Sequence, residues 1–404
     1  MKILHIEEFF HPNAGYQVNM LARLQAKAGH DVTVMTAEFQ KLPGFLTDFF
    51  GKENIAAKDA RYSAETNVEI IRIPVWAYYS GRVIFNFFKL IASAIKVRPD
   101  IAVVHGLDGF AGILFITLSK WLSFPIVVDC HMIDMASKNR FSKFFRNFYK
   151  ICIAPIIRAR GIQVIRVVED NYIEKHLGLS LEQSILMPLG TDTDYFTPNI
   201  EVRRDQRADL GYSEDDFIVL YAGKLDDQKG GKFLGEALKK KFKHHGVKRI
   251  KFMIIGTCVG DYGLAVEQLF SQSENDITRI NTQSYLDLVR FYQAADLVIF
   301  PKQCSMSFFE AQSCGVPVLF EDNNINMSRV RGENAFTFES GNMDDFRQKI
   351  ELLAFRSSEE KNISSKRARE YVLTNNDFVQ TAERFTVLLK NIGDEFVKSK
   401  AGYN

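Results

Sequence analysis

Short runs of β-branched and other apolar residues alternate along this chain with longer segments of helical period. This alternation is typical of a parallel sheet that is covered by helices. The expected strands of the first half are Ile3–Ile6, Val32–Thr36, Val68–Ile73, Ile101–His105, Ile126–Asp129, Val164–Val168 and Ile185–Pro188. Those of the second half are Ile218–Ala222, Lys251–Ile255, Leu297–Phe300 and Val316–Phe320. The chain is therefore predicted to have an α/β fold of the doubly wound type.

The strand pattern pauses once, at a polar stretch from 189 to 207 that contains Gly190 and Pro198. Such a pause predicts two Rossmann-like domains, each with its own sheet, facing a central cleft. We expect the first domain to span 1–195 and the second 196–380, with a helix in 381–404 that packs back on the first domain.

Composition narrows the class of protein. With 404 residues, 46% of them hydrophobic, the chain has enough apolar material for two compact cores. Its 51 Lys and Arg against 49 Asp and Glu leave a formal charge of +2, which is too balanced for a dedicated nucleic-acid binder. The cysteines form no Cys-x-x-Cys pair, so neither a disulfide framework nor a zinc site is predicted.

The same sequence predicts where the protein works. The N-terminal segment reaches Glu7 and Glu8 too early for the apolar core of a signal peptide. The longest apolar stretch, 101–128, is interrupted by charged residues and a proline, so it lacks the roughly 20 apolar residues of a spanning helix. We therefore expect a cytoplasmic protein, either soluble or peripheral on the inner face of the plasma membrane.

Two loops between an expected strand and an expected helix are candidates for binding an anion. The first contains Ala14 and Gly15, whose small size lets backbone N–H groups approach an anion; the alternative is a simple turn. The second carries Lys224 and Lys229, five residues apart, and this pair suits a diphosphate. Its alternative is a solvated turn with surface lysines.

A third such loop follows Leu297–Phe300. Ser305 and Ser307 stand in it where helix N-caps belong, and free backbone N–H groups there form a seat for an anion. Glu310 lies about one turn into the following helix, in a place to accept hydrogen bonds from two vicinal hydroxyls. The alternative is a glutamate that only stabilises the positive end of the helix dipole.

Basic and aromatic residues interleave at helical spacing between 138 and 151. The phenylalanines of one stripe are Phe141, Phe144, Phe145 and Phe148. The cations of a second stripe are Lys143, Arg146 and Lys150. Such a helix suits the surface of an anionic membrane, with Phe85–Lys89 and Trp76–Tyr79 as candidates for the same face. The alternative is an ordinary amphipathic helix that packs its aromatic side chains on the sheet.

The order of several short motifs resembles that of the retaining glycosyltransferases of family 4, which have the GT-B fold. The motifs are Gly-Lys-x4-Lys-Gly at 223–230, Ile-Ile-Gly-Thr at 254–257, Ala-Ala-Asp at 294–296 and Phe-Glu-Ala-Gln-Ser-Cys-Gly-Val-Pro-Val at 309–318. Upstream, 186–196 resembles the interdomain segment of that family, and 29–34 resembles its second strand. The likeness extends over nearly the whole chain.

The resemblance implies roles for the donor-side residues. Lys224 and Lys229 would hold the phosphates of a nucleotide sugar, and Glu310 would bind its ribose. The residues that would meet the donor are further Gly15, Ser305, Met306 and Ser307. Lys302 stands where the family has the first Glu of an acidic pair, which is the larger departure from the family pattern.

The resemblance also implies a histidine close to the donor sugar. His131, in the loop after Ile126–Asp129, matches that histidine. Its expected catalytic role is to hydrogen-bond a sugar hydroxyl or to help position the acceptor. Without the resemblance, a lone histidine beside an aspartate is more often a structural residue.

Taken together, these features predict a transferase. The sugar would move from a nucleotide-sugar donor to a hydroxyl of a glycan or lipid-linked acceptor, with retention, in the synthesis of a bacterial surface polysaccharide such as an O-antigen or a capsule. No metal or other cofactor is expected, since no Asp-x-Asp triplet ends a strand of the second domain and Asp192-Thr193-Asp194 belongs to the linker. The expected partners are the donor, the acceptor and an anionic membrane surface, and no nucleic acid.

Two alternatives come from other classes of protein. A non-catalytic subunit of GT-B type that binds a sugar nucleotide or a partner enzyme would also show an altered acidic pair. A two-lobed solute-binding protein would share the paired α/β domains, but it would carry an export signal.

Overall fold

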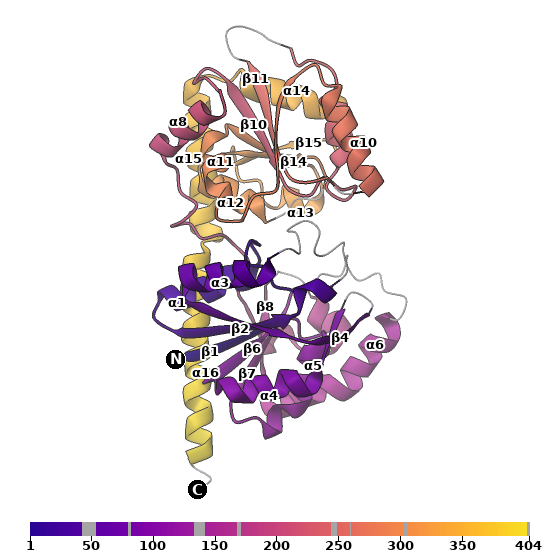
Figure 1. Ribbon diagram of the computed structural model, residues 1–404, viewed down its shortest axis with the longest axis vertical. Helices are drawn as coiled ribbons and strands as arrows, with labels where there is room; N and C mark the ends of the chain where they lie inside the picture. The colour runs from indigo at the N-terminus through magenta and orange to yellow at the C-terminus, as the bar shows by residue number, and fades with distance from the viewer. Residues whose placement is uncertain are drawn as a thin grey trace. The chain divides into compact units, whose positions relative to one another are not determined.

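The computed structural model of the protein describes residues 1–42, 54–79, 82–132, 142–167, 171–243, 249–258, 260–302 and 306–401 (Figure 1). The described chain divides into two compact units. Unit 1 contains the residues up to Leu189 and those from Val379 on, and unit 2 is Gly190–Phe378. The boundaries expected after residues 195 and 380 lie a few residues beyond these, and the segment after residue 380 clusters with unit 1.

Unit 1 is built on a parallel sheet with the strand order β3-β2-β1-β6-β7-β8-β9. Its strands are β1 (Lys2–Glu7), β2 (Asp31–Ala37), β3 (Val68–Ile73), β6 (Ile101–Val104), β7 (Ile126–Cys130), β8 (Gln163–Arg166) and β9 (Ser184–Leu186). Successive strands run outward in one direction from β1 and in the other from β6, so the β1–β6 pair is the switch point of the sheet. Ligands of α/β sheets bind outside the carboxyl ends of the strands at this point.

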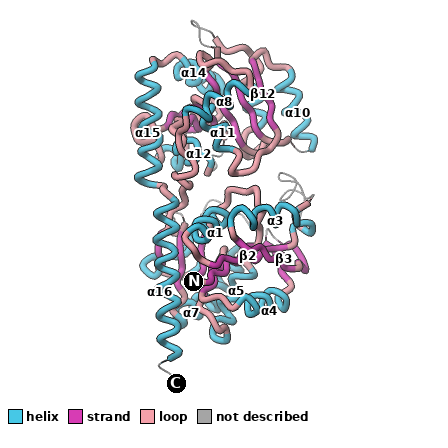
Figure 2. The backbone as a smooth tube through the Cα atoms, turned by 60° about the vertical axis from the view of Figure 1, so that its left-hand side comes forward, coloured by secondary structure: helices cyan, strands magenta, loops and turns pink. Residues whose placement is uncertain are grey.

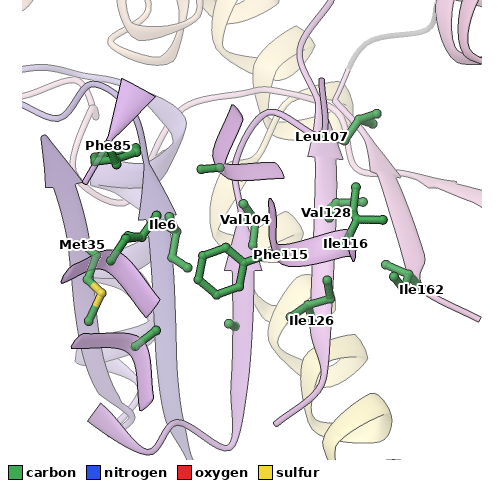
Figure 3. Packing of buried hydrophobic residues seen from close by; sticks show 14 of the residues in the cluster. Ile6, Met35, Phe85, Val104, Leu107, Phe115, Ile116, Ile126, Val128 and Ile162 are labelled. Atoms are coloured by element: carbon green, nitrogen blue, oxygen red, sulfur yellow. The ribbon is translucent and has the colours of Figure 1, made fainter. Parts of the chain in front are cut away.

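Helices cover both faces of this sheet. They are α1 (Gln17–Lys27), α3 (Ile55–Thr66), α4 (Phe87–Val97), α5 (Phe110–Leu118), α6 (Ser142–Phe148), α7 (Ala154–Arg160) and α16 (Phe378–Ala401). One face packs mainly on α4, α5 and α7, where Ile6, Val104 and Phe115 belong to a large buried cluster (Figure 3). A smaller cluster that includes Val18, Val34 and Tyr62 lies under α1 and α3.

Unit 2 repeats the same plan. Its parallel sheet has the strand order β12-β11-β10-β13-β14-β15. The strands are β10 (Phe217–Ala222), β11 (Ile250–Ile255), β12 (Asp276–Ile280), β13 (Leu297–Phe300), β14 (Val318–Glu321) and β15 (Ala335–Phe338). The switch point is the β10–β13 pair.

The helices of unit 2 surround this sheet (Figure 2). They are α8 (Ile200–Asp209), α9 (Gly231–Ala237), α10 (Gly260–Ser271), α11 (Leu288–Ala294), α12 (Ser307–Ser313), α13 (Asn324–Met327), α14 (Met343–Ala354) and α15 (Ser358–Asn375). The buried cluster of this unit combines strand residues such as Val219, Phe252 and Ile299 with Leu234 of α9 and Phe346 of α14.

The expected α/β fold is confirmed, and each expected strand is present with its ends shifted by at most two residues. The structure adds β12 and β15 at the two edges of the unit 2 sheet. It also adds an antiparallel hairpin in unit 1, β4 (Val75–Tyr79) with β5 (Arg82–Phe85). Edge strands and hairpins are half exposed, so a pattern of continuous buried apolar runs does not identify them.

The expected basic and aromatic helix is wound differently from the prediction. α6 passes into a π-helical turn at Tyr149–Ile153 before α7 begins. A π-turn inserts a residue relative to α-helical period, which rotates the side chains that follow. Before the π-turn the expected stripe is already divided: Phe145 packs on the core, Phe144 and Phe148 are exposed, and Phe141 lies outside the described residues.

Candidate functional site

Two of the predicted donor loops lie next to each other in unit 2. The loop with Lys224 and Lys229 follows β10, and the loop that begins at Pro301 follows β13. Because β10 and β13 are hydrogen-bonded parallel neighbours at the switch point, their carboxyl ends open at the same place. The fold thus brings Lys224, Lys229 and Lys302 to one edge of the sheet.

The loop after β10 is held in shape by its own polar groups. The Tyr221 hydroxyl donates to the Lys224 carbonyl oxygen at 2.5 Å, and Asp226 Oδ1 accepts from the Lys229 N–H at 2.9 Å. Both lysine side chains are half-buried. A loop restrained in this way presents its two ammonium groups with little loss of freedom when an anion binds.

A close approach between two glycines supports this loop from the side of β11. The Gly223 N–H donates to the Ile255 carbonyl oxygen at 3.0 Å. Gly256 has φ +141°, and a Cβ at this residue would lie 2.0 Å from the Gly223 carbonyl oxygen. Only glycine is compatible with this contact, which explains the glycine of the Ile-Ile-Gly-Thr motif.

Lys302 links the two loops. Its Nζ donates to the Asp227 carbonyl oxygen at 3.2 Å and lies 3.5 Å from Asp227 Oδ1. Its stem lies over Gly230, the residue before α9. The residue that replaces the first Glu of the family's acidic pair is therefore bound to the neighbouring loop through a surface ion pair.

Glu310 is buried in α12, with 5% of its surface exposed. The Tyr292 hydroxyl of α11 donates to its Oε2 at 3.0 Å. Burial raises the pKa of Glu310 to about 7, while the hydrogen bond from Tyr292 acts in the opposite direction. A carboxyl group that ionises near neutral pH inside the protein has an unusual environment, as functional carboxyl groups often do.

The serine-rich part of the third loop differs from the prediction. α12 begins at Ser307, with Met306 at the N-cap and no side-chain cap bond, so Ser307 is the first helical residue and not a cap. Ser307 instead contacts the buried Tyr292 hydroxyl. Ser305 lies outside the described residues.

The predicted sites of unit 1 lie at the carboxyl edge of its sheet. Gly15 is half-buried in the loop between β1 and α1, where the Ala14 N–H donates to the His11 carbonyl oxygen at 3.0 Å. Nearby, Arg82 bonds Asp108 at 2.7 Å, and Glu8 Oε2 accepts from the Val83 N–H at 3.2 Å. Burial raises the pKa of Glu8 to about 7, against the opposing charge of Arg82.

His131 follows β7 directly and pairs with a buried aspartate. Its Nε2 lies 3.2 Å from Asp129 Oδ2, and 38% of its side chain is exposed. Burial lowers the pKa of His131, but the charge of Asp129 and its hydrogen bond outweigh this effect and raise the pKa to about 9. The ring is therefore positively charged at neutral pH.

Asp129 has other partners besides His131. His105 Nδ1 lies 2.5 Å from Asp129 Oδ2, and the Gly106 N–H donates to Oδ1 at 2.8 Å. Burial raises the pKa of Asp129, but the neighbouring His131 and His105 outweigh it and hold that pKa below its usual range. The sequence motif Asp-Cys-His predicted the histidine, whereas His105 was not predicted.

His105, Asp129 and His131 bring nitrogen and oxygen ligand atoms within 4.8 Å of one another, a grouping that metal ions use. The hydrogen bonds just described already occupy these atoms, with the Asp129 carboxylate as their common acceptor. The three side chains thus form a hydrogen-bonded cluster with the Asp129 carboxylate at its centre.

The edge of unit 2 opposite the two loops also contains a cavity, of about 320 Å³. Its wall includes Phe217, Leu297 and Pro317, at the amino ends of the strands, with Arg203 and Arg356 beside them. The cations have protein partners: Arg203 bonds Asp296 at 2.6 Å, and Arg356 bonds Glu333 at 2.8 Å. This cavity is separate from the predicted donor residues.

The region 142–153 exposes large apolar side chains beside cations. Phe144 is 77% exposed and Ile151 is 73% exposed, and both Lys143 and Lys150 are exposed. Arg146 differs from the prediction, since it is half-buried with its guanidinium carbon 5.7 Å from the centre of the Tyr172 ring. Lys150 donates to the Lys175 carbonyl oxygen at 3.0 Å.

A second exposed aromatic group lies on the β4–β5 hairpin and α4. Phe88 is 80% exposed, and its ring and that of Phe87 contact Trp76 edge-on. Phe85, which was expected on the same face, is fully buried. Among the described helices, none combines the length and apolar character needed to cross a bilayer.

Comparison with solved structures identifies the fold. A glycosyltransferase from Rickettsia africae ESF-5 superimposes with a TM-score of 0.70 and 17% identity, over 96% of this chain and 98% of that one. The HepE protein of Anabaena, solved with UDP and glucose, gives a TM-score of 0.69 and 16% identity, over 97% of this chain and 100% of that one. These are GT-B proteins, and the two sheets described above have the GT-B arrangement of strands.

Curated relatives match a smaller share of this chain than these solved structures do. A D-inositol 3-phosphate glycosyltransferase of Paenarthrobacter aurescens is 27% identical over 157 residues, which are 37% of this chain and 38% of the relative. The chain thus matches little more than a third of the length of such relatives. An Escherichia coli UDP-Gal:alpha-D-GlcNAc-diphosphoundecaprenol alpha-1,3-galactosyltransferase is 23% identical over 314 residues, 74% of this chain and 77% of the relative.

Family profiles match both units. Residues 14–195 match Glycosyltransferase Family 4, and residues 202–371 match Glycosyl transferases group 1. Together the two matches span most of the chain and contain the histidine of unit 1 and the two lysines and the glutamate of unit 2. The chain therefore belongs to the group 1 glycosyltransferases, which are related to family 4 and have the GT-B fold.

Proposed function

We propose that the protein transfers a sugar from a nucleoside-diphosphate sugar to a hydroxyl group of a glycan or lipid-linked acceptor, with retention of anomeric configuration. The observation that carries this proposal is the pair of adjacent loops after β10 and β13, which places Lys224 and Lys229 at the switch point of unit 2. The Anabaena relative of the same fold was solved with UDP and with glucose, so uridine diphosphate is our first choice of leaving group.

In the proposed reaction, the bond between the anomeric carbon and the diphosphate oxygen breaks, and a bond from the acceptor oxygen forms on the same face. The acceptor hydroxyl loses its proton, and negative charge develops on the diphosphate. Lys224 and Lys229 stabilise that charge, because ammonium groups already in place need no rearrangement as the charge grows.

Glu310 binds the ribose of the donor in this proposal. As a carboxylate it accepts hydrogen bonds from two adjacent hydroxyls. Such donors favour the ionised form, and because the pKa of Glu310 is near 7, they shift the group toward that form at neutral pH. His131 supplies a charged N–H donor for a sugar hydroxyl or for the acceptor. No metal ion has a part in the proposal, since the lysines supply the positive charge.

The acceptor we propose is a lipid-linked saccharide on the way to a bacterial surface polysaccharide. The Escherichia coli relative is named for a diphosphoundecaprenol acceptor, which lies in a membrane. The exposed Phe144 and Ile151 beside Lys143 and Lys150 have the composition of a surface that binds anionic lipid. The protein would then work from the cytoplasmic face of the plasma membrane as a peripheral protein.

One observation favours a second candidate function. Lys302, in place of the first acidic residue of the family pattern, is bound to Asp227 and does not resemble a sugar-binding carboxylate. A non-catalytic subunit that binds a sugar nucleotide without transferring the sugar would tolerate this change.

A panel of sugar nucleotides separates the two functions. Thermal stability is measured first with each nucleotide, because a ligand at a hundred times its Kd stabilises by about 2.7 kcal/mol. The nucleotides that stabilise the protein are then incubated with lipid-linked and soluble acceptors, and release of the nucleoside diphosphate is measured. Transfer supports the enzyme. Binding without transfer or hydrolysis supports the subunit, and absence of any stabilisation refutes both.

The control for this panel is a pair of matched double variants. Lys224→Ala with Lys229→Ala should abolish the stabilisation. Lys239→Ala with Lys240→Ala removes the same charge from exposed residues just after α9 and should leave it unchanged.

A further inference from the structure

Buried and half-buried side chains of unit 1 form an unbroken row of hydrogen bonds behind His131. The row begins on α16, which runs beside the sheet of unit 1 (Figure 2). Its links are Thr386 to Gln25 at 3.3 Å, Gln25 to His5 at 2.7 Å, His5 to His105 at 3.0 Å and His105 to Asp129 at 2.5 Å. Asp129 then contacts His131 at 3.2 Å.

The alternation of side chains along the strands brings these residues together. Ile6, Val104 and Val128 point into the cluster under α4, α5 and α7 (Figure 3). The residues one position away, His5, His105 and Asp129, therefore face the opposite side of the sheet. Since β1, β6 and β7 are neighbours, the three side chains lie in a row across the sheet.

The direction of the hydrogen bonds is fixed from the α16 end. The Thr386 hydroxyl donates to the Ala382 carbonyl oxygen at 2.7 Å, so its oxygen accepts from the amide nitrogen of Gln25. The amide oxygen of Gln25 then faces His5 Nε2, and this nitrogen must carry a hydrogen. Reversing the amide would place two acceptors against each other at Thr386, so the orientation is determined.

The hydrogen-bond partners also determine which ring nitrogens of His5 and His105 carry a hydrogen. Burial, together with the charge of His105, lowers the pKa of His5 to about 3, so His5 is neutral and has a single ring hydrogen, on Nε2. Its Nδ1 is consequently an acceptor, and His105 Nε2 donates to it. His105 Nδ1 also donates, because its partner is the Asp129 carboxylate. His105 thus carries both ring hydrogens and a positive charge.

We propose that His5 and His105 are positioning residues for His131. His5, held neutral and oriented by Gln25, keeps His105 doubly protonated. His105 and the Gly106 N–H then hold the Asp129 carboxylate in place. Asp129 in turn keeps His131 charged, with its Nε2–H turned inward. The Nδ1–H of His131 is then the donor presented to a substrate oxygen. That last step rests on the proposed function, whereas the protonation pattern does not.

The charged groups around His131 agree with this arrangement. Besides Asp129, the carboxyl groups that face it are Glu7, at the end of β1, and Asp108, after β6. Both raise the pKa of His131, in addition to Asp129. Glu7 also interacts electrostatically with His105. Burial raises the pKa of Glu7, whereas the charges of His105 and His131 and the Phe9 N–H act in the opposite direction.

Nitrogen NMR of the histidine rings tests the pattern directly in the unmodified full-length protein. Ring nitrogens with and without a hydrogen have distinct shifts, and they are followed from about pH 6 to about pH 10. At pH 7 we expect both nitrogens of His105 and of His131 to be protonated and His5 to be neutral with its hydrogen on Nε2. A neutral His105, or a His5 hydrogen on Nδ1, would overturn the proposal, and this measurement needs no variant that folds.

The variant Asp129→Asn gives a second, independent readout. Removing the carboxylate charge should lower the proton affinity of His131 by more than about a hundredfold, to the ordinary pKa of a histidine or below. The matched control His30→Gln, in the turn before β2, should leave the titration of His131 unchanged. An unchanged titration in Asp129→Asn would refute the role of Asp129.

The outcome for the proposed function is separate. If the protein transfers sugar, the alkaline limb of its kcat profile follows the His131 titration and moves to lower pH in Asp129→Asn. A protein with the expected ring signals and no transfer activity would refute the proposed function and leave the row of positioning residues standing.

Discussion

Replacing Glu310 by glutamine should make unit 2 relatively more stable as the pH rises. The carboxyl group has a pKa of about 7 in the folded protein, against 4.5 as its ordinary value. A raised acid pKa contributes stability that is fully present below about pH 4.5 and is lost as the pH rises through about 7. Glutamine does not titrate, so the variant lacks this loss.

The magnitude follows from the pKa difference. Linkage gives a loss of roughly 2–3 kcal/mol for the parent protein between about pH 5 and about pH 8. The free energy of unfolding of Glu310→Gln, relative to that of the parent, should improve by this amount over the same range. The constant effect of the substitution itself cancels in this comparison, as do the other titrating groups.

Hydrogen exchange of the backbone amides in β10 and β13 is the assay. These central strands report the unfolding free energy of unit 2 once exchange is corrected for the intrinsic rate at each pH. The control is Glu236→Gln, on the exposed face of α9; its difference from the parent should not change with pH. A difference between Glu310→Gln and the parent that stays constant from about pH 5 to about pH 8 would show that Glu310 is ionised at both values and that the reasoning is wrong.

Three further predictions concern the proposed donor loop and membrane surface. Lys224→Ala and Lys229→Ala should each weaken UDP binding about tenfold or more, since hydrogen bonds to charged groups contribute roughly 1.5–3 kcal/mol, and calorimetry that finds the parent's Kd for both would refute the assignment. Gly256→Ala should displace the loop after β10, because the added Cβ would lie 2.0 Å from the Gly223 carbonyl oxygen. UDP binding or thermal stability should therefore fall, and a variant in which both are unchanged would contradict the close approach of the two glycines. Replacing Lys143, Arg146 and Lys150 by Glu should release the protein from anionic vesicles, because each lost cation weakens membrane binding by about 1 kcal/mol. UDP binding should stay intact. If neither the substitutions nor added salt changes cosedimentation with the vesicles, membrane binding is refuted.

The strands and the donor loops could be predicted because their signals are local. Buried parallel strands are continuous apolar runs, and Val219, Ile254 and Ile299 lie in such runs. The same criterion fails for β12, whose sequence Asp-Ile-Thr-Arg-Ile is half-buried at the edge of the sheet. Edge strands need only one covered face, so they lack the pattern that identifies central strands.

The row behind His131 depends on the order of the strands, which no local pattern contains. His5, His105 and Asp129 are far apart in the sequence, and they meet only because β6 inserts between β1 and β7. Once a doubly wound order is assumed, counting alternate residues outward from each strand would have placed all three on one face. The positions of Lys150 and the residues after it were harder to predict, because the π-turn at Tyr149–Ile153 breaks the helical period.

The division of the chain has a consequence for how it folds during synthesis. Unit 2 is a continuous segment that ends at Phe378, whereas unit 1 takes α16 from beyond that point. The ribosome therefore completes unit 2 before it delivers Phe385 and Leu389, which are buried in the finished protein. Until then unit 1 lacks these two apolar side chains, and the Gln25 amide lacks Thr386. We expect a nascent chain stalled just after residue 378 to hold a protease-resistant second unit and a first unit that still binds chaperones.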